Sequence, residues 1–374
     1  MVCKPPFRLY PLILAACLAP AFSSCEQPPG SAPGEEHDPA PTDGTYTPLG
    51  GTEPETIPAG FSWVRGGTVG GSDDYKIAFT YPPGASFEGE QGIQYGAFVS
   101  GRVVTIPSFF MARYEVTGSR WREVYDWAVS GDRAGLGYKF ANPGSGGGGD
   151  EPVAEISWRD AVVWCNAASE KDGLEPVYYT YGGAAILRDA TGKEPPPNAP
   201  ADLAVMKREK NGYRLPTMCE REYAARGGDP RKPDWLYRYA GSDNPDEVAW
   251  YYGTSGVGLP EGHKDYGLHP VGQKKPNRLG LYDLSGNVME WGWDWMRYDA
   301  NAKLPPMGTL EMHARLDPTT PEEGPPYGPR ANQKPMSGGN WHASSPYSLV
   351  AIWWGYTTDY HDDKVGFRLA RSAP

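Results

Sequence analysis

The residues with the most chemical capacity lie near the C-terminus, between the glycine turn Gly338-Gly339 and an alternating stretch at residues 365–371. This segment is dense in Tyr, Trp, His, Asp and Ser, and it has no helical period. Tyr and Trp give large contact areas at low entropy cost, while Ser, Asp and His give adaptable hydrogen bonds, a mixture typical of binding surfaces. We predict that a ligand is bound here by Trp341, His342, Ser344, Tyr347, Ile352, Trp354, Tyr356, Asp359, Tyr360, His361 and Asp362.

The same segment has two other interpretations. If residues 349–354 form a strand, alternate side chains face opposite sides. Leu349, Ala351 and Trp353 would then face a core, and Val350, Ile352 and Trp354 would face the other way. His342 and His361 flank the segment, and His361 precedes two aspartates, so imidazole and carboxylate groups form a candidate metal site. A solvated polar loop is the simpler interpretation of those histidines.

Composition limits the class of protein. The chain has 374 residues with 13 Trp, 24 Tyr, 48 Gly and 39 Pro, which favours a turn-rich protein with aromatic packing over a helical bundle. The net charge of -11 disfavours a nucleic-acid partner, which requires a basic surface. Of five cysteines, only Cys165 and Cys219 lie in the expected folded part. We interpret both as buried thiols, with a disulfide between them as the alternative.

The N-terminus has the pattern of a sorting signal. Its apolar stretch, residues 9–22, follows two basic residues and is too short for a transmembrane helix. Residues 1–25 resemble a bacterial lipoprotein signal with Cys25 as the lipidated residue; lipidation at Cys17 and an ordinary cleaved signal peptide are the alternatives. An acidic tether rich in Pro, Gly and Ser follows at residues 26–56. We therefore expect an exported protein, lipid-anchored in the cell envelope at the outer membrane or cell surface, and in contact with the membrane only through this lipid.

The elements that position the C-terminal segment follow from periodicity and capping residues. Alternation predicts strands at residues 61–69, 103–107 and 109–116. Capping residues predict three helices, at residues 120–130 after Thr117 or Ser119, from Ser157 to Gly173, and from Thr217 to Gly227-Gly228. A polar excursion at residues 178–210 predicts a hairpin or an insertion, and residues 299–334 form a long proline-rich loop.

Five segments, taken together and in order, resemble the formylglycine-generating enzyme (sulfatase-modifying factor) family. They are FFMARYEVT at residues 109–117, PVAEISWRDAVVWCN at 152–166, GYRLPTMCEREYAARGG at 212–228, LGLYDLSGNVMEWGWDW at 279–295, and the end of the chain from 337 to 371. The resemblance implies one α+β domain of the C-type-lectin-like type at residues 57–374. Such a domain has little regular secondary structure and long ordered loops.

The resemblance also implies two metal sites, one of which lacks its ligands here. The family's oxidase binds copper through two cysteines, and their positions carry Ala343 and Ser348, so no copper is expected. The family's second calcium loop implies a structural Ca²⁺ held by the carbonyls of Ser285, Gly286 and Val288 and by the carboxylate of Glu290. In the alternative, Asn287 and Glu290 only satisfy the turn.

The same fold is used by variable proteins of diversity-generating retroelements, several of which are lipoproteins ending in the same frame. In those proteins the segment between the glycine turn and the final alternating stretch is mutated at adenines of a template, which permits a limited set of amino acids. In this chain all residues from 342 to 363 belong to that set except Trp353 and Trp354. We therefore expect a non-catalytic lipoprotein that binds a protein or glycan ligand. An oxidoreductase of the family, and a scaffold that assembles a partner, are the alternatives.

Overall fold

The computed structural model describes residues 44–75, 77, 96–100, 103–130, 135–145, 149–194, 198–260, 262–295 and 333–374. The predicted signal at residues 1–25 with Cys25, the first part of the tether, and most of the proline-rich loop at residues 299–334 lie outside these residues. Within the described part of the chain, no helix has the length and apolarity needed to span a bilayer.

The fold consists of short strands, few helices and long connections. The helices are α1 (Gly118–Val129), α2 (Trp158–Lys171), α3 (Met218–Ala225) and α4 (Pro245–Val248). The strands are β1 (Tyr46–Pro48), β2 (Phe61–Val64), β3 (Gly67–Gly70), β4 (Val103–Ile106), β5 (Phe109–Glu115), β6 (Tyr178–Tyr179), β7 (Val205–Met206), β8 (Ala249–Trp250), β9 (Ser285–Gly286), β10 (Met289–Trp291), β11 (Gln333–Ser337), β12 (Trp353–Thr357), β13 (Val365–Gly366) and β14 (Arg368–Ser372).

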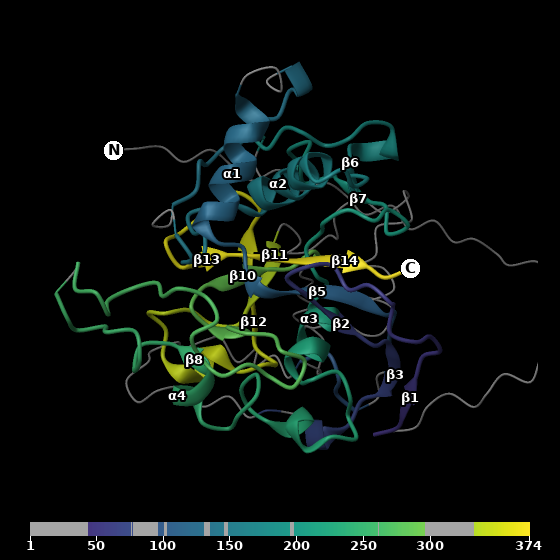
Figure 1. The fold of residues 1–374 in the computed structure, drawn as a ribbon, viewed down its shortest axis with the longest axis vertical. Coiled ribbons are helices and arrows are strands. Elements are labelled where there is room, and N and C mark those ends of the chain that lie inside the picture. Colours follow the sequence, from purple (N-terminus) through teal and green to yellow (C-terminus); the bar gives the residue numbers. More distant parts are fainter. Residues whose placement is uncertain are drawn as a thin grey trace, which may run out of the picture. The chain divides into compact units, whose positions relative to one another are not determined.

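Small sheets bring distant parts of the chain together. The order β14-β5-β2 joins the C-terminal strand to two early strands, and β12-β11-β10-β13 carries the predicted ligand-binding segment. In the second sheet, β10 and β13 are parallel while β11 is antiparallel to both β10 and β12. In Figure 1, α1 and α2 lie above β10, β11 and β14, and α3 lies below them. This mixed arrangement confirms the predicted α+β class.

Local capping explains where the helices begin. The Thr117 side chain accepts from the Arg120 backbone N–H at the start of α1. Both α2 and α3 begin with a complete capping box, formed by Ser157 with Asp160 and by Thr217 with Glu220. These starts confirm the predicted helices, although α1 begins two residues before the predicted boundary.

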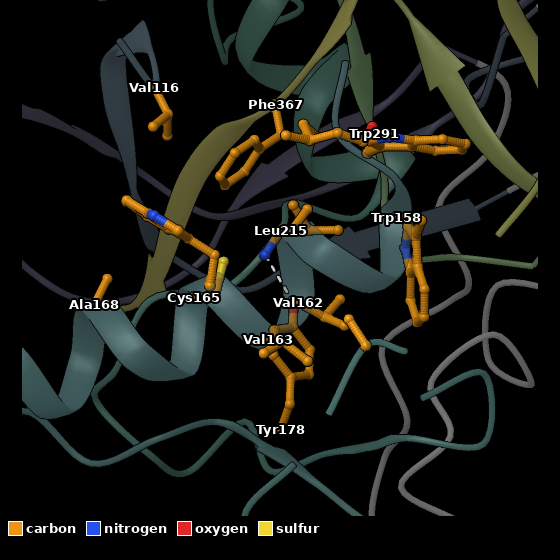
Figure 2. Close-up of a cluster of buried hydrophobic side chains, with 14 of the residues drawn as sticks. Val116, Trp158, Val162, Val163, Cys165, Ala168, Tyr178, Leu215, Trp291 and Phe367 are labelled. Atoms are coloured by element: carbon orange, nitrogen blue, oxygen red, sulfur yellow. Dashed lines mark hydrogen bonds between the residues drawn. The ribbon is translucent and has the colours of Figure 1, made fainter. Parts of the chain in front are cut away.

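Helix α2 is buried on nearly all sides. Twelve of its fourteen residues are buried. Figure 2 shows Trp158, Cys165 and Phe367 in the surrounding cluster, where the Leu215 backbone N–H donates to the Tyr178 hydroxyl at 2.8 Å. Cys165 is a free thiol, as predicted, and its burial raises its pKa, so it stays protonated and unreactive.

The structure bears on two predicted segments, the tether at residues 26–56 and the excursion at residues 178–210. Strand β1 pairs antiparallel with β3, so residues 46–48 of the predicted tether belong to the folded unit. Within the excursion at residues 178–210, β6 and β7 pair antiparallel over two residues each, with a long connection between them, so it combines a hairpin-like base with an insertion.

Candidate functional site

The C-terminal segment is held in a frame of strands. Strand β11 leads into Gly338-Gly339, whose φ angles of 97° and 68° favour glycine. A Cβ at Gly339 would clash with Ser348, so the turn packs directly on the segment that follows it. After the turn, the chain returns in β12, where Trp354 pairs with Met336 and Tyr356 with Lys334.

Asn287 links this frame to the rest of the domain. It is fully buried at φ 57°, a conformation that asparagine tolerates better than most residues. Its amide nitrogen donates to the Glu115 carboxylate at 2.8 Å and to the His269 carbonyl at 3.1 Å. Its own carbonyl accepts from the Trp341 backbone N–H at 2.8 Å. Asn287 therefore connects the start of the C-terminal segment, at Trp341, to Glu115 and His269 in the body of the domain.

Trp341 and Ile352 differ from the other predicted ligand-binding residues in being buried, so they present little area to a ligand in this structure. Trp341 is 5% exposed, its indole N–H donates to the Asp363 carbonyl at 3.4 Å, and its ring meets Tyr266 edge-on. It thereby joins the beginning of the segment to its end. Ile352 is 3% exposed and belongs to a hydrophobic core cluster.

The predicted alternation before β12 is wrong. Residues 349–352 form turns and are all buried, and the strand begins only at Trp353. They follow a short 3-10 helix, Ser345–Ser348, and lie in the core cluster that also contains Tyr239 and Val248. Because all the side chains of this turn are buried, alternation along the sequence does not indicate which of them face solvent.

The other predicted ligand-binding residues are partly or fully exposed. We call them the C-terminal surface, defined as His342, Ser344, Tyr347, Trp354, Tyr356, Asp359, Tyr360, His361 and Asp362. Their aromatic rings pair with one another: Tyr356 and Tyr360 stack at 4.4 Å, and Tyr347 and Trp354 lie 5.6 Å apart. Burial, and then the Asp362 carboxylate, raise the pKa of Tyr360 to about 12, so its hydroxyl remains a donor.

Tyr252 extends this surface, although sequence reasoning missed it. Its side chain is 53% exposed, and its ring lies 6.2 Å from the His342 ring in an edge-on arrangement. Its backbone N–H donates to the Ala343 carbonyl at 2.9 Å. Only the fold brings this loop beside the glycine turn, and no local pattern marks it.

A caged lysine lies beneath the surface. Lys334 is 1% exposed, and its ammonium lies 3.8 to 4.8 Å from the ring centroids of Trp158, Trp293 and Trp295. It donates to the Trp293 carbonyl at 2.8 Å. Burial lowers the pKa of Lys334, while the indole faces favour its charged form. Lys334 pairs in register with Tyr356 between β11 and β12, so the two side chains lie on the same face of this strand pair.

The charged groups at the end of the segment are mostly paired locally. Lys364 forms an ion pair with Asp362 at 2.9 Å and a second with Asp363, and the His361 ring lies 3.2 Å from the Asp359 carbonyl. In the described ranges, no group of three His, Cys, Asp or Glu side chains is close enough to hold a metal ion.

The two positions expected for copper ligands do not fit copper. Ala343 presents a methyl group, and its backbone N–H donates to Asn340. Ser348 is fully buried, and its hydroxyl has no hydrogen-bond partner among the described residues. Copper(I) selects soft thiolates, which neither side chain supplies.

Glu290 does not fit the predicted calcium site. It is fully buried, and its two oxygens take hydrogen bonds from Arg221 at 2.9 Å and from Arg368 at 2.6 to 2.9 Å. Burial alone would raise the pKa of Glu290, but these two guanidinium groups outweigh it and lower the pKa below its usual value. Their positive charges repel a divalent cation. Calcium at the carbonyls of Ser285, Gly286 and Val288 stays a prediction.

The strands, loops and aromatic frame together define a C-type-lectin-like domain. Residues 52–373 match the family described as the Sulfatase-modifying factor enzyme 1-like domain, and the chain belongs to that family.

Curated relatives resemble parts of the chain. It is 38% identical over 204 residues to the Chaperone protein LppX of Paenibacillus barcinonensis, covering 52% of this chain and 65% of that protein. It is 38% identical over 115 residues to the Formylglycine-generating enzyme of Thermomonospora curvata, covering 30% and 35%. The chain thus spans less than two thirds of each relative's length. Among solved structures, Treponema denticola variable protein 1 is similar with a TM-score of 0.51 and 25% identity, over 83% of this chain and 96% of that one.

Proposed function

We propose that this chain is a non-catalytic, lipid-anchored envelope protein that binds a protein or glycan ligand through the C-terminal surface and Tyr252. The observation that carries the proposal is the pair Ala343 and Ser348 at the positions of the copper thiolates. Without soft ligands, the copper-dependent oxidation known in the family has no metal to activate oxygen.

The chemistry of the C-terminal surface supports recognition. Tyr356, Tyr360 and Tyr252 offer rigid aromatic area, and His342 and Asp359 are exposed polar groups beside them. Aromatic anchors surrounded by adaptable polar groups dominate the energy of many interfaces. The buried frame beneath, from Trp341 to the Lys334 cage, supports these anchors in fixed positions, which lowers the entropy cost of binding.

Two further parts of the proposal, the lipid anchor and the diversification, rest on the sequence and on the comparisons with known proteins. The lipobox-like sequence at Cys25 supports the lipid anchor, as does the likeness to the Chaperone protein LppX. The likeness to Treponema denticola variable protein 1 supports diversification of residues 342–363. Sequencing this gene across sibling strains tests diversification: substitutions concentrated at these residues support it, and substitutions spread evenly over the domain contradict it.

The binding proposal is tested by screening the folded protein against a glycan array and an envelope extract, together with a double variant. Tyr356→Ala/Tyr360→Ala removes the stacked pair, and we expect it to weaken any genuine ligand at least about 30-fold, as loss of an aromatic anchor does. Tyr181→Ala is the control, because Tyr181 is 64% exposed and lies outside the C-terminal surface. Ligands that bind the double variant and wild type equally contradict the proposal.

A second candidate function is that of a chaperone for one partner protein, and the likeness to the Chaperone protein LppX favours it. The two candidates differ in the constancy of the partner. One partner recovered from every strain, through a surface whose sequence does not vary, supports the chaperone. Different ligands for strains that differ at residues 342–363 support diversified recognition.

A further inference from the structure

A cavity away from the C-terminal surface lies between the ends of α1 and α2 and strand β6. Its volume is about 500 Å³, which is within the usual range of small-molecule sites. Trp127 comes from α1, Glu170 and Lys171 come from α2, and Tyr179 comes from β6. The segment after α2 adds Glu175 to the lining.

Aromatic and aliphatic side chains form the apolar part of the cavity. Trp127 and Tyr179 are half-buried, and Leu136 and Leu174 add aliphatic groups to the lining. The Lys207 ammonium lies 3.8 Å from the centroid of the Tyr179 ring, which fixes that ring. Aromatic faces carry negative charge density and attract the weakly positive C–H groups of a ligand.

The charged side chains of the lining are all held in ion pairs. The pairs are Glu170–Arg188 at 2.5 Å, Glu175–Lys210 at 2.7 Å and Lys171–Glu123 at 2.6 Å. A charged ligand would compete with existing partners at each of these groups; the cost is largest at the Glu170–Arg188 pair and modest at the exposed Glu123 and Glu175. A purely apolar ligand would remove water from the charged groups and give nothing in return. The lining therefore favours a neutral ligand with many hydrogen-bonding groups.

The paired groups still have hydrogen-bonding capacity. A carboxylate offers roughly four acceptor positions and an ammonium three donors. Glu170 uses one position on each oxygen, for Arg188 and for the Tyr138 hydroxyl. We propose that this cavity binds a short neutral saccharide, with a C–H face packed on Trp127 or Tyr179 and hydroxyl groups bonded to Glu170, Glu175 and Lys171. This site is separate from the C-terminal surface and does not depend on the function proposed for it.

Saturation-transfer NMR and calorimetry on the folded protein test the proposal. The neutral probes are N-acetylglucosamine, cellobiose and lactose, and the charged probes are glucosamine and glucuronate. We expect saturable binding of at least one neutral probe, with a dissociation constant of roughly 1 mM or below. Neither charged probe should bind more tightly.

Variants locate the site. Tyr179→Ala and Glu175→Ala should each weaken the neutral probe at least tenfold; Glu175 is largely exposed, so its variant keeps the fold. Tyr181→Ala, in the same segment but outside the lining, and Tyr356→Ala, on the C-terminal surface, should leave the affinity unchanged. The absence of saturable binding by all three neutral probes, tighter binding of a charged probe, or equal affinity in the Glu175→Ala variant would each overturn the proposal.

Discussion

Glu290→Gln is the substitution whose consequence follows most directly from the structure. The change keeps the size of the side chain but removes the one negative charge among the described residues with which both Arg221 and Arg368 form ion pairs. Both arginines are at most 1% exposed, so neither gains water as compensation. Breaking a buried ion pair by removing one partner costs about 3–5 kcal/mol. Since two cations share this carboxylate, we expect a loss near the upper end.

The assay is urea unfolding of the wild type and the variant, followed by thermal melting. A loss of about 3–5 kcal/mol corresponds to a fall in Tm of roughly 4–8 °C for a domain of this size. Glu123→Gln is the matched control: this carboxylate also contacts two cations, Arg120 and Lys171, but its side chain is 51% exposed, so we expect a loss of at most about 1 kcal/mol. A loss below about 1 kcal/mol for Glu290→Gln would refute the reasoning.

The same pair of proteins tests calcium. If two arginines are the partners of Glu290, a chelator such as EGTA should leave the melting curve of the wild type unchanged. If Glu290 binds calcium, EGTA should lower the Tm of the wild type toward that of Glu290→Gln and should not affect the variant. Calcium held by the carbonyls of Ser285, Gly286 and Val288 alone would lower the Tm of both proteins.

Three further substitutions test buried polar groups. Burial is the main cause that raises the pKa of Asp283 to about 6, so the native state keeps a proton that the unfolded chain loses above about pH 4. The stability contributed by this group therefore falls as pH rises from about 4 to 6. Asp283→Asn should flatten this pH dependence in urea unfolding, and the φ of 54° at this position suits asparagine. An unchanged pH dependence would contradict the reasoning. Ser348→Ala should be neutral or stabilising by about 1 kcal/mol, because the hydroxyl has no partner among the described residues. Ser285→Ala should cost about 1–2 kcal/mol, since its hydroxyl accepts from Ala240 and donates to Ser348, and equal effects of the two serine substitutions would refute the comparison.

Local signals predicted what is local in the fold. Thr117, Ser157 and Thr217 marked the helix starts because an N-cap needs only residues within one turn. The glycine turn and the alternating stretch at the end of the chain, residues 365–371, were also predicted, since glycine φ angles and alternation are short-range properties.

The rest depends on contacts between distant residues. Arg221 and Arg368 flank Glu290 only in the folded chain, so the sequence motif alone could not distinguish an ion pair from a calcium ligand. Tyr252 reaches His342 in the same way. Ile352 was assigned to the surface because an alternating strand would direct it away from the core, whereas the fold encloses that turn in a core cluster.

The central claim is that this member of the family recognises a ligand and does not oxidise a cysteine. Oxygen consumption by the purified protein, with one equivalent of copper(I) and a cysteine-containing peptide, tests it most directly. Because Ala343 and Ser348 replace both thiolates, we predict no oxygen uptake above that of free copper and no conversion of the peptide. Stoichiometric copper binding with oxygen-dependent turnover of the peptide would contradict the account.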